Sequence, residues 1–569
     1  MGKIKLECWQ KISLAFCGMI IIASVLLLAP FVQNLVFYFV ERFVVRRSLT
    51  RIVWIERFAK YGIKTISFFL FASITIIFWE NIRKSKIFIP YFLLFLMSAL
   101  ILMRSPLNPF ANGNSSTDSS VFRYIAQLMQ NGGVPYRDAF DHKGPLLFFI
   151  NYWGTKISFE HGGWILEVAF LFFTMFATYR LARLFLSCYK ALIPIAFVYM
   201  LMKFFFEGGN LTEEYALLFI SLSIYIFTDY FLFGKISILR LVLCGASFAC
   251  VVLLRANMIS VWLVFCPMVA IQRIRKKEYA QILNFLAFFF LGMAVIFLPT
   301  LIYFWCHDAV KDFVECYFIF NMKYSANKNW KDRILSMKKF AITFHFIIAC
   351  ITILLCIKNS KTKENKFFNI GYFIFLFSAL FFTALSGRQY GHYYMAMLPT
   401  LIYPFCFFFK TTFDKDIFKF NIHGQTHSAK LCYYFAVALF IICGWYALYA
   451  GAIFSKYQDS DFEKIVPLIQ EITSANEKII VLGNRNIAYL KSRRLAASKY
   501  SYQMPIGLIE PKIMDEFFYE IENSFPRVAL IDKGYNDVEF VEKVDWFLKN
   551  NNYEKIDEVK MYSIFMRKN

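Results

Sequence analysis

The sequence predicts a polytopic α-helical membrane protein that ends in a small α/β domain. Of its 569 residues, 59% are hydrophobic and only 18% are charged, and the mean hydropathy is +0.50. Soluble domains carry about 25% charged residues and do not sustain such long apolar runs. Runs such as 283–305 and 341–357 approach the roughly 20 residues that a helix needs to cross a bilayer. After residue 454 the apolar runs become short, which indicates a different kind of domain.

About thirteen apolar segments are expected to be transmembrane helices. They are separated by polar or charged residues, so successive segments cross the membrane in opposite directions. The expected spans lie near residues 12–40, 62–79, 87–104, 163–180, 190–206, 214–233, 237–254, 256–272, 283–305, 341–357, 367–385, 393–410 and 430–454.

The charges of the loops predict the orientation, because loops rich in Lys and Arg stay in the cytoplasm. Loops of this kind are 272–279, 357–366 and 410–430. Alternation of the spans then places three loops on the extracytoplasmic face: 105–162, 207–214 and 386–394. The chain after residue 455 falls on the same face. We therefore expect a multi-pass protein of the cell inner or plasma membrane.

The basic loop 41–64 disagrees with this count, which places it outside the cell. Apolar residues are interleaved with its arginines, a pattern typical of a helix that lies in the membrane interface. The alternative is that the first span is counted wrongly.

The chain divides into a membrane domain, residues 1–454, and a soluble extracytoplasmic domain, residues 455–569. In the second part, 477–483 and 527–534 are short apolar runs that end at Gly and predict buried strands. Around them, 461–474 and 536–551 show the apolar spacing of helices. A small α/β domain without cysteine is the expected result.

The net charge of +23 does not indicate a nucleic-acid partner. Residues 455–569 hold 17 Lys and Arg against 18 Asp and Glu, so the excess lies in the membrane domain, where it follows the positive-inside rule. The 13 cysteines form neither a CxxC pair nor a Cys/His cluster with metal-ligand spacing. The composition therefore favours neither nucleic-acid binding nor a cysteine-bound metal.

Ionisable residues recur on the three expected extracytoplasmic loops. The segment VPYRDAFDHKGPL (134–146) alone contains two Asp, one Arg, one His and one Lys. Carboxylates can deprotonate a hydroxyl or hold a divalent cation, whereas basic side chains can neutralise a phosphate. This combination at a membrane surface favours transfer of a group from a lipid phosphate. The residues on these loops are Asp118, Arg137, Asp138, Asp141, His142, Lys143, Glu213, Arg388, Tyr390, His392 and Tyr393.

The order of several motifs resembles the GT-C glycosyltransferases, notably the protein O-mannosyltransferase-like and aminoarabinose-transferase-like families. In those enzymes an Asp, often followed by Glu, begins the first extracytoplasmic loop, and a KPPL or HPPL element ends it before an interfacial helix. Asp118 and DHKGPLLFFI (141–150) resemble these two elements. SGRQYGHYYMAMLP (386–399) resembles a later R-x-x-x-H-Y-x-x-x-x-x-P element, and 483–500 resembles the tail domain of bacterial members.

The resemblance implies a GT-C fold and an inverting transfer of a monosaccharide from a polyprenyl-phosphate donor. Asp118 matches the base that acts on the acceptor hydroxyl, and Lys143 matches the lysine that contacts the donor phosphate. Arg388 and His392 match the later element near the phosphate, and we expect Arg137 to bind the same group. Two residues depart from the pattern: Ser119 stands where many relatives have Glu, and Gly144 replaces the first Pro.

The departures leave alternatives open at the site. Asp141 competes with Asp118 for the catalytic role, and Asp138 is a further carboxylate beside the substrate. Glu213, Tyr390 and Tyr393 are expected to contact substrate. A divalent Mg, Mn or Zn ion held by Asp141 and His142 is the cofactor alternative.

The expected activity is glycosyl transfer to a hydroxyl of a glycan, lipid or protein acceptor on the extracytoplasmic face. The expected partners are the polyprenyl-phosphate sugar, membrane lipids and that acceptor. Two rival functions are a lipid-linked glycan flippase or transporter, and an O-antigen ligase or polymerase type of enzyme that uses a lipid-diphosphate oligosaccharide. A transporter would place charges in the middle of the spans, where the sequence has few.

Overall fold

The computed structural model describes residues 88–109, 116–414, 421–422, 425–426, 460–534 and 537–568. The predicted spans 12–40, 62–79 and 430–454 and the basic loop 41–64 lie outside the described residues. The chain forms two compact units, Met1–Leu93 and Leu94–Asn569. The first contains the beginning of helix α5 (Phe88–Ile101), and the description that follows concerns the second.

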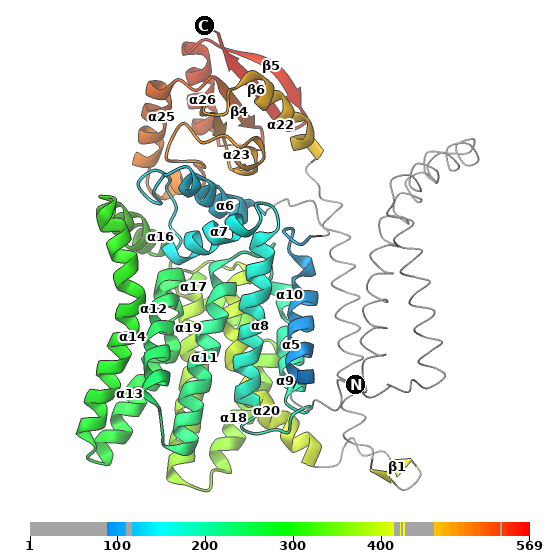
Figure 1. Cartoon of the computed structure of the whole chain (residues 1–569), viewed down its shortest axis with the longest axis vertical. Helices are drawn as coiled ribbons and strands as arrows, with labels where there is room; N and C mark the ends of the chain where they lie inside the picture. The colour runs from blue at the N-terminus through cyan, green and yellow to red at the C-terminus, as the bar shows by residue number, and fades with distance from the viewer. Residues whose placement is uncertain are drawn as a thin grey trace, which may run out of the picture. The chain divides into compact units, whose positions relative to one another are not determined.

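The second unit is built on a bundle of long apolar helices (Figure 1). Among the described residues, five helices are long and apolar enough to cross a membrane, or six if a pair bent by 78° counts as one. The five are α8 (Gly162–Ala182), α11 (Thr212–Phe233), α12 (Ile238–Arg255, extended by a 3₁₀ turn to Met258), α14 (Tyr279–Cys306) and α19 (Lys363–Ala384). The number thirteen stays a prediction.

The ends of the bundle helices follow from their sequences. Ser237 accepts a hydrogen bond from the backbone N–H of Arg240 and so caps α12. Helix α11 ends at Gly234, whose positive φ of 72° is the left-handed conformation that commonly ends helices. The predicted spans 214–233, 237–254 and 283–305 therefore match α11, α12 and α14 closely.

Shorter helices complete the bundle. The predicted span 190–206 is two helices, α9 (Leu192–Tyr199) and α10 (Met202–Phe205), rather than one. The others are α13 (Ser260–Arg275), α18 (Phe344–Lys358) and α20 (Leu398–Asp414). Helices α13 and α20 share an aromatic core with the long helix α19. In it Phe265, Phe368, Tyr372 and Tyr403 are buried against one another.

Short elements gather at the end of the bundle nearest the C-terminal domain (Figure 1). Helix α7 begins at Pro145, which lacks the N–H that a first helical turn leaves unpaired. The elements are α6 (Thr117–Gln130), α7 (Pro145–Ile157), α15 (Val310–Phe313), the π-helix η3 (Val314–Ile319), α16 (Phe320–Ala326), α17 (Trp330–Ala341) and the 3₁₀ helix η4 (Gly391–Met397).

The C-terminal domain contains the predicted small sheet, with strand order β3-β4-β6-β5. Strands β3 (Ile480–Leu482) and β4 (Val528–Asp532) are the two predicted buried strands and pair in parallel, with Ile480 opposite Ala529. Strand β6 (Tyr562–Arg567) joins β4 antiparallel, and β5 (Tyr553–Val559) joins β6 antiparallel. The last two strands form a hairpin that the sequence analysis did not predict.

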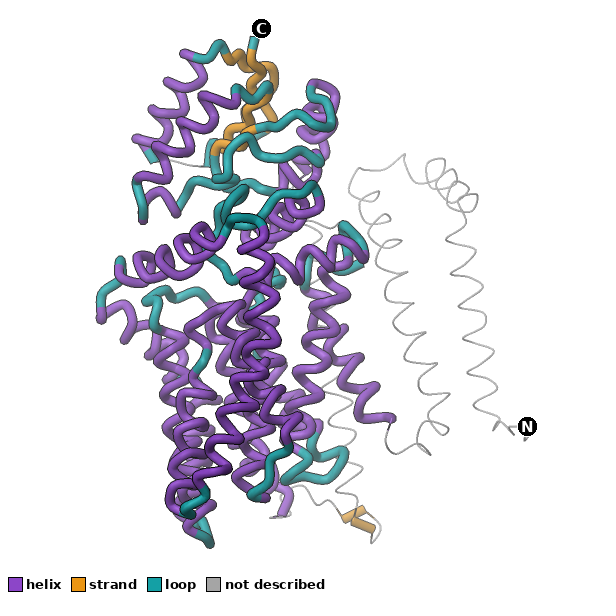
Figure 2. Tube along the Cα trace, turned by 60° about the vertical axis from the view of Figure 1, so that its left-hand side comes forward, coloured by secondary structure: helices purple, strands orange, loops and turns teal. Residues whose placement is uncertain are grey.

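Helices cover this sheet (Figure 2). Helices α22 (Ser460–Ile472) and α26 (Val538–Asn550) are the two that the sequence predicted, and Asp537 caps α26 by accepting from the N–H of Phe540. The remaining helices are α23 (Ile487–Ser492), α24 (Ile506–Ile509) and α25 (Lys512–Ser524). A separate two-stranded ribbon pairs β1 (Asn421–Ile422) with β2 (Gln425–Thr426).

The C-terminal domain contacts the segment 116–162 through buried polar bonds. The N–H of Ala496 donates to the hydroxyl of Tyr124 over 2.9 Å, and the side-chain amide of Gln127 donates to the carbonyl of Arg494 over 3.2 Å. The N–H of Phe140 donates to the carbonyl of Lys499 over 2.8 Å. These contacts place the domain directly over the loop that carries the predicted site.

Candidate functional site

The first half of the 134–146 segment forms a surface turn. Asp138 accepts a hydrogen bond from the backbone N–H of Val134 at 2.7 Å and pairs with Arg137 at 2.8 Å. Arg137 also donates to the backbone carbonyl of His307 over 2.8 Å. Burial raises the pKa of Asp138, but Arg137 and the N–H of Val134 outweigh it and the net pKa is lowered. Arg137 and Asp138 therefore bind each other at the surface, and neither lines the cavity described below.

The second half of the segment is a tight turn around a buried carboxylate. One oxygen of Asp141 accepts the backbone N–H of Lys143 over 2.7 Å. The other oxygen accepts the hydroxyl of Tyr502 from the C-terminal domain over 3.4 Å. Burial raises the pKa of Asp141 to about 6; Asp118 acts in the same direction and Lys143 opposes it. With both oxygens engaged, Asp141 is suited to fixing the position of Lys143.

His142 is held between aromatic rings. Its ring stacks on Tyr324 at 5.2 Å between centroids, and its carbonyl accepts the side-chain amide of Asn321 over 2.6 Å. Burial lowers the pKa of His142 well below its ordinary value, and Lys143, Arg255 and Arg388 act in the same direction. The imidazole is therefore neutral, with its Nε2 only 3.3 Å from the ammonium of Lys143.

Lys143 lies in the wall of a cavity of about 300 Å³. Burial lowers the pKa of Lys143, but Tyr393, Asp118 and Asp141 outweigh this effect and the net pKa is raised. The polar wall consists of His142, Lys143, Arg255, Asn257, Tyr317, Asn321, Tyr324, Ser325, Ser386 and Tyr393. The apolar wall consists of Leu254, Ala256, Phe318, Met322 and Leu385. The cavity thus combines cationic and hydrogen-bonding groups with an apolar surface.

A close approach between two backbone segments explains why Gly144 stands where the KPPL element has its first Pro. The N–H of Gly144 donates to the carbonyl of Leu254 over 3.2 Å. A Cβ atom at this position would lie 2.0 Å from the carbonyl oxygen of Leu253 and 2.7 Å from that of Leu254. Proline would lose the donor and clash with α12, so only glycine allows the start of α7 to approach this closely.

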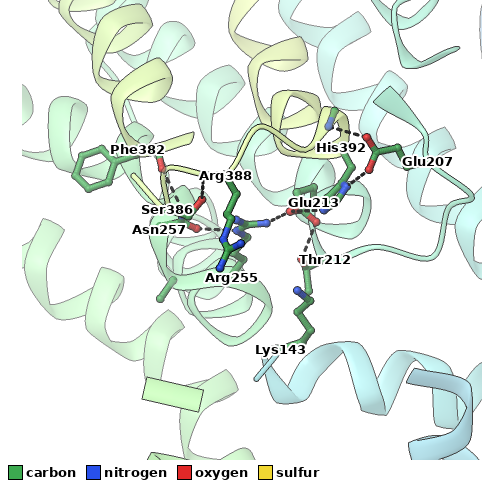
Figure 3. Close-up of polar contacts among 12 residues, drawn as sticks. Lys143, Glu207, Thr212, Glu213, Arg255, Asn257, Phe382, Ser386, Arg388 and His392 are labelled. Carbon is green, nitrogen blue, oxygen red and sulfur yellow. Dashed lines mark hydrogen bonds and ion pairs between the residues drawn. The ribbon is translucent and has the colours of Figure 1, made fainter. Parts of the chain in front are cut away.

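Arg255 is the centre of a charged network that joins three segments (Figure 3). It forms an ion pair with Glu213, whose side chain is only 2% exposed, and Thr212 donates to the same carboxylate over 2.8 Å. His392 Nε2 is 3.9 Å from Glu213, and His392 Nδ1 is hydrogen-bonded to Glu207. The end of α12, the start of α11 and the 386–394 loop are therefore tied together beside the cavity.

The protonation of the His392–Glu207 pair follows from burial. Burial lowers the pKa of His392, and Arg255 and Lys143 act in the same direction, against the opposing effect of Glu207. Burial raises the pKa of Glu207, but its bond to His392 outweighs this and the net pKa is lowered. A neutral imidazole that donates from Nδ1 to an ionised Glu207 agrees with the lowered pKa of both groups.

Aromatic rings hold the cations of the site. The guanidinium of Arg255 lies 3.6 Å from the ring centroid of Tyr393, and that of Arg388 lies 4.5 Å from the centroid of Tyr324. Cations over aromatic faces are stabilised by the ring quadrupole. Tyr390 stacks on His392 at 5.6 Å and is 43% exposed. Of the predicted residues of the 386–394 loop, Tyr393 lines the cavity, whereas Arg388 and His392 contact the wall residues Tyr324 and Tyr393 from outside it.

Asp118 occupies the first turn of α6, with its side chain exposed. Burial has the largest effect on the pKa values of Asp141, Lys143 and Tyr502, raising those of Asp141 and Tyr502 and lowering that of Lys143. The charge of Asp118 raises all three. Asp118 therefore lies near these groups while its own carboxylate stays accessible. Of the two rival carboxylates, Asp118 is free to meet a substrate and Asp141 is enclosed.

The residue after Asp118 is fixed to the bundle through Asn210. The side-chain amide of Asn210 donates to the hydroxyl of Ser119 over 2.9 Å. Its backbone N–H donates to Glu167 over 2.6 Å and to Glu214 over 3.0 Å. Ser119 thus serves here as a buried attachment point of α6, at the position where many relatives have Glu.

The proposed metal ligands are poorly arranged for a divalent cation. Both oxygens of Asp141 accept protein donors, and an ammonium lies beside Nε2 of His142. Among the described residues, no group of three or more His, Cys, Asp and Glu side chains is placed to hold a metal ion. The residues present do not fit a resident ion between Asp141 and His142.

Several residues of the site were missed by the sequence analysis. Arg255 lies between the predicted spans 237–254 and 256–272, and a lone arginine between two spans is a signal that could have identified it. Asn321 and Tyr324 belong to segment 306–340, which alternation also places outside, and that placement is the signal that points to them. No local signal distinguishes Tyr502 in the C-terminal domain.

Comparisons with known proteins agree with this architecture. A family model described as "Putative competence-induced protein Ccs4 N-terminal domain" matches residues 80–430. No curated protein matches the chain. The crystal structure of ArnT from Cupriavidus metallidurans bound to undecaprenyl phosphate is similar, with a TM-score of 0.54 and 10% sequence identity over 85% of this chain and 98% of that chain.

The apo structure of the same ArnT gives a TM-score of 0.54 and 10% identity over 82% of this chain and 95% of that chain. At this identity the likeness shows the fold alone, which is that of ArnT and agrees with the expected GT-C fold. The family model covers more than half of the residues, and the chain therefore belongs to the Ccs4 N-terminal domain family.

Proposed function

We propose that this protein is an inverting glycosyltransferase that uses a polyprenyl-phosphate monosaccharide. The observation that carries the proposal is the composition of the cavity, where Lys143 and Arg255 face the same space as Leu254, Phe318 and Met322. Met322 is 73% exposed and Phe318 is 36% exposed. An amphiphile with an anionic head and an apolar chain matches such a wall.

Two cations in the cavity wall and a third beside it are suited to bind a phosphate. Lys143 supplies a point charge. Arg255 adds a guanidinium that is also paired with Glu213 and donates from Nε to Asn257 over 2.9 Å. Arg388, over the ring of Tyr324, adds a second guanidinium beside the wall. Asn257 lines the same space, and one hydrogen of its side-chain amide is bonded to the carbonyl of Phe382 over 3.0 Å. Charge-assisted bonds to phosphate are roughly twice as strong as neutral ones, so this group stabilises the charge on the departing lipid phosphate.

Asp118 is the base in the proposed reaction. The acceptor hydroxyl attacks the anomeric carbon and gives its proton to the Asp118 carboxylate. The new carbon–oxygen bond forms as the bond between the anomeric carbon and the phosphate oxygen breaks, and the lipid phosphate leaves with the electron pair. Because phosphate is a good leaving group, this step needs one base and charge compensation rather than the two carboxyl groups of a glycosidase.

The comparison with ArnT supports the donor class, since that structure was solved with undecaprenyl phosphate. The positive-inside rule supports the sidedness: loops 272–279 and 357–366 lie at the end of the bundle opposite the cavity (Figure 1). The proposed site therefore faces the extracytoplasmic side of the inner or plasma membrane. The acceptor in this proposal is a hydroxyl of an envelope glycan, lipid or protein.

The experiment uses the purified full chain in lipid with synthetic short-chain polyprenyl-phosphate sugars and a membrane extract as the source of acceptor. Release of polyprenyl phosphate is measured for the wild type, Asp118→Asn, Lys143→Gln and the control Arg137→Gln. Loss of a general base commonly costs about 10²–10⁴ in rate, which is the expectation for Asp118→Asn. Lys143→Gln should raise the KM for donor, and Arg137→Gln should behave like the wild type.

Two results would overturn the proposal. One is release that persists unchanged in folded Asp118→Asn. The other is absence of release from every monophosphate donor together with turnover of a lipid-diphosphate oligosaccharide, which would establish the ligase or polymerase type of activity.

A further inference from the structure

Helix α17 lies across the direction of the neighbouring span. It is followed by α18, and the two are bent by 78° at the break between them. Because α18 is apolar and continues towards the cytoplasmic loop 357–366, α17 runs nearly parallel to the membrane plane. The residues that follow it, Ile342 and Phe344, are 63% and 64% exposed. This is the position of a helix in the membrane interface.

The outward face of α17 mixes large apolar side chains with lysines. Trp330, Ile334 and Leu335 are 60%, 62% and 48% exposed. Lys331 and Lys338 are exposed as well, and their spacing of seven residues puts them on one side of the helix, between Ile334 and Leu335. Lysines whose stems lie along apolar neighbours can extend their ammonium groups to lipid phosphates.

The inward face of α17 holds the loop that carries Arg388. The hydroxyl of Ser336 donates to the carbonyl of Arg388 over 3.2 Å, and the hydroxyl of Tyr394 donates to the carbonyl of Ser336 over 2.8 Å. Lys339 donates to the carbonyl of Gln389 over 3.0 Å. A displacement of α17 therefore moves the 386–394 loop.

The positive-inside rule does not explain the basic charge of α17. The helix carries Lys331, Arg333, Lys338 and Lys339 against a single acid, Asp332. It lies at the end of the bundle that holds the cavity, which the proposed orientation places outside the cell, where the positive-inside rule does not call for basic residues. Anionic lipid headgroups are the surrounding chemistry that complements them.

We propose that α17 binds anionic phospholipids of the leaflet on the cavity side, and that this contact orders the 386–394 loop. Trp330 and Ile334 enter the acyl boundary while Lys331 and Lys338 pair with headgroup phosphates. The inference is independent of the transfer reaction, and it uses the proposed orientation only to explain the excess of lysine. Its consequence is a protein whose site loop depends on the lipid composition of the membrane.

The test measures binding of phosphatidylglycerol to the full chain in neutral detergent by native mass spectrometry, with phosphatidylcholine as the uncharged comparison. Each lysine near an anionic surface contributes about 1 kcal/mol, which is about fivefold in affinity. Lys331→Gln/Lys338→Gln should therefore weaken phosphatidylglycerol binding by about 25-fold. Lys464→Gln/Lys549→Gln removes the same charge from exposed positions of the C-terminal domain and should leave binding unchanged.

A second measurement tests the link to the loop. Amide hydrogen exchange of residues 386–394 should slow when phosphatidylglycerol is added to phosphatidylcholine vesicles containing the wild type, and should not respond in the α17 double variant. Equal lipid binding by the double variant and the wild type would overturn the proposal. That result is expected if another part of the chain covers the outward face of α17. Lipid binding without any change of exchange in 386–394 would overturn the ordering of the loop.

Discussion

The hydroxyl of Tyr502 donates a hydrogen bond to a carboxylate oxygen of Asp141, 3.4 Å away, although the two residues are 361 positions apart in the chain. The other oxygen of Asp141 accepts the N–H of Lys143. A residue of the C-terminal domain is therefore connected through one carboxylate to the lysine in the cavity wall. The domain helps to define the site instead of merely covering it.

Tyr502→Phe tests this connection. The hydroxyl stabilises the ionised form of Asp141, so its removal should raise the pKa of Asp141 above the present value of about 6. A hydrogen bond worth about 1 kcal/mol corresponds to a displacement of the acid limb of the pH–rate profile by roughly 1 pH unit, towards higher pH. The measurement is the rate of polyprenyl phosphate release from pH 5 to 9. A purely structural effect would lower the rate equally at every pH.

Asp141→Asn should separate the two rival carboxylates. Asparagine can still accept the N–H of Lys143, so the turn is retained and a measurable part of the activity remains, unlike in Asp118→Asn. Because the folded pKa of Asp141 is raised, its contribution to stability is present below about pH 4 and is lost as the pH rises through about 6. Asp141→Asn should remove this loss, which is at most about 3 kcal/mol.

The measurement for Asp141 is thermal unfolding in detergent at several pH values. We expect the variant to gain stability relative to the wild type as the pH rises from 4 to 7. A difference that does not change with pH would show that Asp141 is not the titrating group.

Arg255 and Glu213 should behave as a coupled pair. Arg255→Gln leaves a buried carboxylate without its partner, and breaking a buried pair from one side commonly costs about 3–5 kcal/mol. Glu213→Gln in the same chain should recover part of that stability, because no unpaired charge remains. Thermal unfolding of the two single variants and the double variant gives the coupling energy. Strictly additive effects would contradict the pairing.

Gly144→Ala should disturb the cavity by sterics alone. The added Cβ would meet the backbone of Leu253 and Leu254, which cannot move without shifting α12 and Arg255. Overpacking of this kind typically costs about 1–3 kcal/mol. Gly371→Ala is the matched control, since its Cβ would meet only the flexible end of the Met268 side chain. Thermal unfolding should show a clearly larger loss for Gly144→Ala, and equal losses would refute the close approach of α7 and α12.

The sequence by itself determined the class of the protein, several of its spans and the first two strands of the C-terminal sheet. Helices α11, α12 and α14 were predictable because apolar length is a property of one contiguous segment. Strands β3 and β4 were predictable because each is a short apolar run bounded by Gly. The concentration of ionisable residues in 134–146 was equally visible, whereas its membrane face stays a prediction.

Only the tertiary structure decided which of these residues share a site. Arg137 and Asp138 belong to the same segment as Lys143, yet they pair with each other at the surface, and Arg137 also bonds the carbonyl of His307 at the end of α14. Arg255, Tyr324 and Tyr502 come from three distant segments and converge on Lys143 and Asp141. The composition of a loop shows which chemical groups are available. Their convergence depends on how the helices pack and on how the C-terminal domain docks, and no local sequence pattern encodes either.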